Sequence, residues 1–143
     1  LIKEFQRLKN QENDALRLDW NVKRSLTKIN YRIHTDAIKA NLIPPQITKQ
    51  QESIIYASEA DVLNKALFGL TAKEWRENNP EKDGNVRDYV TTEQLIVLVN
   101  LENLNAVFIQ QGIEQGKRLQ LLNNIAITQI TSLLQNSSVK KLK

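Results

Sequence analysis

The sequence contains no cysteine and no methionine, and it has only 4 glycines, 3 prolines and 1 histidine among 143 residues. Without cysteine there can be no disulfide bond, no thiolate metal site and no cysteine nucleophile. The low glycine and proline content excludes a low-complexity or disordered chain and permits long helices. No apolar run approaches the roughly 20 residues of a membrane span, and no secretory leader is recognisable, so we expect a cytoplasmic protein without a membrane partner.

The sequence also lacks the motifs by which most enzymes and metal proteins are recognised. There is no glycine-rich phosphate loop, nucleophile elbow or metal-ligand spacing. The single histidine, His34, has Asp36 two residues away, and positions two apart on a helix point to different faces. Glu59 and Asp61 are interpreted as first-turn residues that complement a helix dipole. We therefore expect no enzymatic activity, no metal and no cofactor.

The first 42 residues carry apolar side chains at spacings of three and four, and no glycine or proline interrupts them. A helix of ~40 residues would be ~60 Å long. That length favours a coiled coil, or two helices that meet near Asp19. Because the rest of the chain is too small to cover this stripe, we expect part of it to pair with a second copy or with a missing domain. The expected dimer seam consists of Leu8, Val22, Leu26, Ile29 and Ile33.

Basic residues recur along another side of the same helix. The chain has a net charge of +4, and the basic excess is concentrated in residues 1–42. Spacings of seven, four, four and seven place the following residues in one row: Arg17, Arg24, Lys28, Arg32 and Lys39. This basic rail could contact backbone phosphates with a salt-dependent affinity. A row of this kind is more often the solvated face of an amphipathic helix.

The segment "LIPPQIT" should end the long helix, because Pro44 and Pro45 lack amide donors and disfavour helical geometry before them. Beyond it, Thr or Ser is repeatedly followed three residues later by Gln, Glu or Asp, which is the spacing of a capping box. These spacings predict three short helices near 48–56, 58–68 and 71–79, with Gly69 closing the second. A polar loop with a turn at Asp83 and Gly84 follows.

Two longer helices are predicted over 92–111 and 115–135. Their short connection, which contains Gly112, indicates an antiparallel hairpin. The expected fold is therefore all-α. It has a long N-terminal helix over 1–42, a helical bundle over 43–135 that ends in this hairpin, and a basic tail over 136–143.

The helix over 92–111 is apolar nearly all round, which is typical of a central helix, yet it carries several asparagines. Buried amides need hydrogen-bond partners. We interpret Asn103, Asn105 and Asn123 as a structural network that fixes the register of the hairpin and of the short helices. The alternative is an amide cluster that binds a ligand.

Three blocks of sequence resemble the C-terminal region of KilA-N domain proteins of phages and bacterial mobile elements. They are "LIKEFQRLKNQENDALRLDWNVKRSLTKINYRIHTDAIKANLIPP", "YASEADVLNKALFGLTAKEWRENNP" and "GNVRDYVTTEQLIVLVNLENLNAVFIQQG". The resemblance extends from residue 1 to about residue 134. It implies that a KilA-N domain, a small α/β DNA-binding fold, lies upstream and that residues 1–42 continue from it. The resemblance carries over no active-site residue.

The expected function is that of a C-terminal oligomerisation or interaction module of a KilA-N-type DNA-binding protein. A homodimer would set the spacing of two upstream DNA-binding domains, as dimers do on paired half-sites. The first alternative is direct nucleic-acid contact through the basic rail. The second is a host-protein-binding effector region, which would present an exposed apolar patch without self-association.

Overall fold

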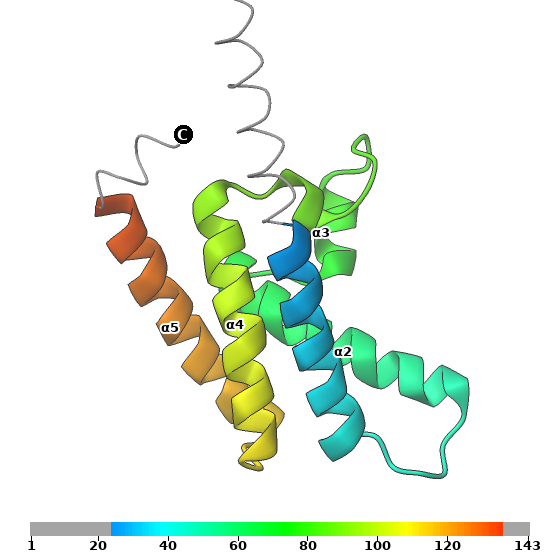
Figure 1. Ribbon diagram of the computed structural model, residues 1–143. Coiled ribbons are helices and arrows are strands. Elements are labelled where there is room, and N and C mark those ends of the chain that lie inside the picture. Colours follow the sequence, from blue (N-terminus) through cyan, green and yellow to red (C-terminus); the bar gives the residue numbers. More distant parts are fainter. Residues whose placement is uncertain (1–23, 136–143) are drawn as a thin grey trace, which may run out of the picture.

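The computed structural model describes residues 24–135 (Figure 1). Within this range the chain is helical and contains no strand, which confirms the all-α class. Residues 24–41 are helical, and the elements that follow are α2 (Lys49–Phe68), α3 (Ala72–Asn78), a short 3-10 helix η1 (Val86–Tyr89), α4 (Thr92–Gln110) and α5 (Gln115–Gln135). Three predicted contact residues, Leu8, Arg17 and Val22, and the predicted tail over 136–143 lie outside the described residues.

The helix boundaries follow from local capping. Thr48, Thr71 and Thr91 each accept a hydrogen bond from the backbone N–H three residues later, and the side chain at that third position returns one to the threonine N–H. Such a cap stabilises a helix by about 1 kcal/mol. Gly69 ends α2 in the left-handed conformation, with φ of 78°, as predicted. Asn85 caps η1, an element that the sequence did not predict.

The predicted break between helices 48–56 and 58–68 is wrong, because α2 runs without interruption from Lys49 to Phe68. Ser58 lies within this helix, and its hydroxyl accepts a hydrogen bond from Gln115 Nε2 at 3.0 Å. Asp61 Oδ1 accepts from the backbone N–H of Ala72 at 3.0 Å, which ties α3 to α2. Both side chains thus serve tertiary contacts. No glycine or proline forces a break between them.

Helices α4 and α5 run antiparallel and are joined by a tight turn, with α4 between α5 and the helix over 24–41 in the view of Figure 1. Helix α2 packs against both of them. The core between these three helices consists of Val62, Leu63, Ala66, Val97, Leu98, Leu101, Leu122 and Ala126. None of the helices in the described range is long and apolar enough to cross a membrane.

A second core cluster attaches the helix over 24–41 to the bundle. Ala37 and Ile38 pack against Ala106 and Ile109 of α4, and residues near the start of α2 cover them. The C-terminal half of the first described helix is therefore part of the bundle. Its N-terminal half leaves large apolar side chains exposed.

The connection between α3 and α4 is held by contacts with Trp75 and Arg76 of α3. Trp75 is buried and lies 5.5 Å from Tyr89, measured between ring centroids. The Tyr89 hydroxyl donates to the carbonyl of Asp83 at 2.8 Å, and the Arg76 side chain donates to the carbonyl of Gly84. These contacts fix the turn at Asp83 and Gly84 and place η1 beside α3.

Candidate functional site: a buried polar cluster and an exposed apolar stripe

Four polar side chains from four helices meet in the interior. They are His34 from the helix over 24–41, Glu59 from α2, Asn105 from α4 and Arg118 from α5, and all four are buried. We call them the buried polar cluster. Burying such groups is costly unless each finds a partner, so their hydrogen bonds decide whether the arrangement is stable.

Arg118 and Glu59 form a two-pronged ion pair. Arg118 Nη2 donates to Glu59 Oε2 at 3.0 Å, and Arg118 Nη1 donates to the other carboxylate oxygen. Gln115 Nε2 also donates to Oε2, at 2.8 Å. Burial raises the pKa of Glu59, but the hydrogen bonds from Arg118 and Gln115 outweigh burial and leave this pKa below its usual value. Arg118 Nε donates to the carbonyl of Ile113 at 2.9 Å, so the guanidinium is held from both sides.

Asn105 connects the ion pair to His34. Its Oδ1 accepts from Arg118 Nη1 at 3.0 Å, and its Nδ2 lies 2.8 Å from His34 Nε2 and 3.4 Å from Glu59 Oε1. Because an amide nitrogen can only donate, His34 Nε2 must accept, and the ring is neutral. Burial lowers the pKa of His34 to about 4, while the carboxylate of Glu59 raises it in part. The cluster therefore ties four helices together through groups that satisfy one another.

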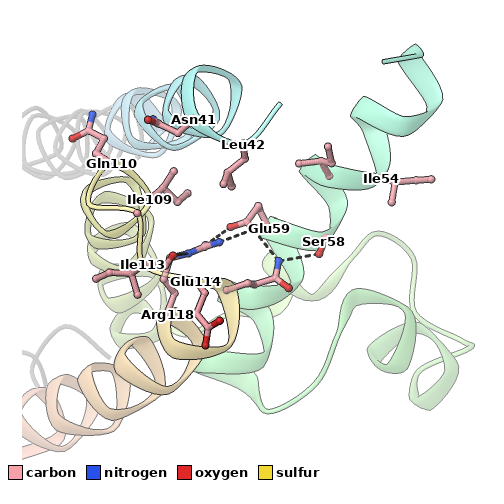
Figure 2. Close-up of a pocket in the computed structure, with 13 residues that line it drawn as sticks. Asn41, Leu42, Ile54, Ser58, Glu59, Ile109, Gln110, Ile113, Glu114 and Arg118 are labelled. Carbon is pink, nitrogen blue, oxygen red and sulfur yellow. Dashed lines mark hydrogen bonds and ion pairs between the residues drawn. The ribbon is translucent and has the colours of Figure 1, made fainter. Parts of the chain in front are cut away.

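The ion pair lies at the wall of a groove of about 660 Å³. Figure 2 shows the side chains of Glu59 and Arg118 pointing toward one another at this wall. Apolar walls come from Leu42, Ile54, Ile55, Ile109 and Ile113. Both carboxylate oxygens of Glu59 already accept hydrogen bonds, and the groove is also lined by polar side chains such as Asn41, Gln110 and Glu114. Nowhere in residues 24–135 do three or more His, Asp or Glu side chains group to hold a metal ion.

The sequence predicts that Asn103, Asn105 and Asn123 form one network, but in the structure these three residues have separate surroundings. Asn105 is fully buried, but its partners come from three other helices. Asn123 Nδ2 donates to the carbonyl of Ala66 at 2.9 Å, which links α5 to α2. The expectation that Asn103 is buried beside Asn105 is wrong, since Asn103 is exposed. Two positions along a helix correspond to about 200° of rotation, which places these two side chains on opposite faces.

Sequence reasoning missed the charged half of the cluster. It interpreted Glu59 as a helix N-terminal residue, because it predicted a helix start at Ser58, and it did not single out Arg118. A signal was present: Glu59 stands four residues before Leu63, and Arg118 stands four residues before Leu122. Both leucines are fully buried. Residues four apart share a helix face, so the two opposite charges fall on core-facing positions.

A second buried carboxylate belongs to Glu102 of α4, which has 0% exposure. Neither of its oxygens has a hydrogen-bond partner, and the Arg87 Nη1 atom of η1 lies 3.6 Å from Oε1. Burial raises the pKa of Glu102 to about 7, and the positive charge of Arg87 lowers it only in part. Unlike Glu59, this carboxyl group is therefore poorly compensated when it is ionised.

The described residues of the expected dimer seam lie on the surface. Leu26, Ile29 and Ile33 are 50%, 54% and 43% exposed, and we call them the apolar stripe. The stripe is about a third of a turn away from the face that carries His34 and Ile38. Beside it is an apolar groove of about 330 Å³, whose apolar walls are Leu26 and three side chains of α4, namely Leu95, Ile96 and Val99.

The described residues of the basic rail, Arg24, Lys28, Arg32 and Lys39, are all exposed. They lie about a third of a turn from the apolar stripe and about a third of a turn from the face that carries His34 and Ile38. The helix over 24–41 thus presents a core face, an apolar face and a basic face. The structure does not bring the rail together with the buried polar cluster.

Comparison with other proteins adds no identification to this geometry. The chain matches no protein-family profile, no curated protein sequence and no solved structure.

Proposed function

We propose that this chain is the self-association module of a KilA-N-type DNA-binding protein, and that it pairs two upstream DNA-binding domains. The observation that carries the proposal is the exposure of Leu26, Ile29 and Ile33 on one helix face. Covering apolar surface is favourable by about 25 cal/mol per Å². A second copy of the chain supplies apolar surface of the same kind.

The neighbouring groove supports a symmetric pairing. A twofold interface uses the same patch on both copies, so that patch must contain both protruding and receiving surfaces. The apolar stripe protrudes, and the groove between Leu26 and the start of α4 is adjacent to it. One copy's stripe can therefore lie against the other copy's groove, and the reverse contact follows by symmetry.

The resemblance to KilA-N proteins supports the role of the dimer. A paired module fixes the distance between two DNA-binding domains, and that distance selects the spacing of the half-sites they read. In this arrangement the described helices contribute geometry, while base recognition belongs to the upstream domain.

The test is the molar mass of the chain in solution, measured by sedimentation equilibrium over about 1 to 100 µM. We expect a dimer for the unmodified chain and a monomer for the double variant Ile29→Glu/Ile33→Glu, because burying two carboxylates in an apolar seam is costly. Ile127→Glu is the matched control: Ile127 is 58% exposed on α5, away from the stripe, so this variant should remain dimeric.

A monomeric unmodified chain over the whole range would overturn the proposal. It would leave the basic rail as the first surface to test for nucleic-acid binding. Loss of the dimer in Ile127→Glu but not in the stripe variant would place the interface on α5 and would equally contradict the proposed seam.

A further inference from the structure

Glu102 is buried without the hydrogen bonds that an ionised carboxylate requires. Its exposure is 0%, and neither oxygen has a hydrogen-bond partner. An ionised carboxylate in this setting loses its hydration and gains few compensating interactions. The neutral acid is less strongly hydrated, so its burial costs much less free energy. The charge on Glu102 is therefore sensitive to whatever cation can approach it.

The cation that approaches it is on a different element. Arg87 belongs to η1, and its Nη1 atom lies 3.6 Å from Glu102 Oε1, just beyond hydrogen-bonding distance. The Arg87 side chain is 29% exposed, so its guanidinium reaches solvent as well as the interior. A small movement of η1 toward α4 would complete the ion pair, and a small movement away would hydrate the arginine.

We propose that Glu102 and Arg87 form a proton-controlled latch between η1 and α4. When Glu102 is ionised, Arg87 is drawn into a direct ion pair that holds η1 against α4. When Glu102 is protonated, that attraction is lost, Arg87 turns to solvent and η1 is released from α4. The latch is independent of the self-association proposed above.

The charged and titratable groups of the buried polar cluster do not account for a change near neutral pH. His34, on the helix over 24–41, is neutral, because burial and, to a smaller extent, the charges of Arg87 and Arg118 lower its pKa. Glu59 of α2 and Arg118 of α5 neutralise each other. Burial raises the pKa of Glu102 to about 7, which places its titration close to physiological pH.

The structure contains a reporter for η1. The indole of Trp75 in α3 lies 5.5 Å from the ring of Tyr89, the last residue of η1, measured between centroids, so a displacement of η1 changes the surroundings of the indole. The sequence has 2 tryptophans, and replacing the other, Trp20→Phe, leaves Trp75 as the only fluorophore of this kind.

The experiment follows Trp75 emission in the Trp20→Phe chain from about pH 5 to pH 9. We expect one transition with a midpoint near 7. Glu102→Gln should remove the transition, because its amide cannot ionise. His34→Gln is the control, and it should leave the midpoint within about half a unit, since His34 stays neutral throughout this range.

A direct titration keeps the proposal testable if Glu102→Gln does not fold. Carboxyl-labelled glutamate in the otherwise unmodified chain, followed by ¹³C NMR, should show one carbon titrating near pH 7. Arg87→Gln should move that midpoint to higher pH, because the variant removes a stabilising positive charge. The latch is refuted if no glutamate titrates above about pH 6, or if one does while Trp75 emission stays constant.

Discussion

At the scale of single residues, Arg118 and Glu59 form an ion pair in which both side chains are buried. Taking two charges out of water is costly, and their attraction offsets that cost only where the geometry and the remaining hydrogen bonds are good. Here Gln115 and Asn105 complete the hydrogen bonding. Because Glu59, Asn105 and Arg118 come from three different helices, the pair also specifies which helices meet.

We expect Arg118→Met to destabilise the fold by about 3–5 kcal/mol, since it leaves Glu59 buried without its partner charge. The double variant Glu59→Gln/Arg118→Met should be less destabilised than Arg118→Met alone, because no unpaired charge remains. Urea unfolding measures both. The neighbouring exposed residue supplies the control, and Lys117→Met should change the stability by no more than about 0.5 kcal/mol. A double variant that is as unstable as the two single changes combined would contradict this account.

At the scale of elements, helix α2 shows how a tertiary contact overrides a local signal. Ser58 and Asp61 have the spacing of a capping box, yet both lie inside the helix and bond to α5 and α3. The helix end is different, because Gly69 adopts φ of 78°, a conformation that a side chain disfavours wherever it occurs. Local chemistry therefore determines the end of α2 but not its continuity.

Gly69→Ala should destabilise the protein by about 1 kcal/mol, since it forces a residue with a Cβ into the left-handed region. No atom lies within 4 Å of the added Cβ, so the cost is conformational strain and not a clash. Gly116→Ala is the matched control: this glycine is helical in α5, its Cβ site is equally open, and the change should stabilise by up to about 1 kcal/mol. Thermal unfolding compares the two, and changes of the same sign would contradict the argument.

At the scale of the whole molecule, two buried groups give stability opposite dependences on pH. Burial lowers the pKa of His34 from 6.5 to about 4, so the unfolded chain binds this proton more readily, and stability rises as pH increases across that interval. Burial raises the pKa of Glu102 from 4.5 to about 7, so the folded chain holds this proton more tightly, and stability falls as pH increases across that interval. The two intervals overlap, and the contributions oppose each other.

We therefore expect the unfolding free energy of the unmodified chain to vary little between about pH 5 and pH 7. His34→Gln should leave a stability that falls with rising pH, and Glu102→Gln one that rises, each by about 2 kcal/mol over the interval. Urea unfolding at several pH values measures the slopes. Slopes of equal sign in the two variants would show that at least one of these groups has been assigned the wrong charge.

The sequence by itself determined the helical class, the capping boxes that begin at Thr48 and Thr71, the glycine that ends α2 and the two long C-terminal helices. These features depend on interactions between residues a few positions apart, so they can be recognised in the sequence. It also showed the apolar stripe, because helical periodicity places Leu26, Ile29 and Ile33 on one side.

Only the tertiary structure decided which polar residues are buried together. Glu59 and Arg118 are far apart in the chain. The residues next to a charged side chain do not indicate which distant group pairs with it when it is buried. Asn103 and Asn105 look alike in the sequence, yet one is exposed and the other lies at the meeting point of four helices. Capping and periodicity are local, whereas the pairing of buried charges depends on how whole helices pack.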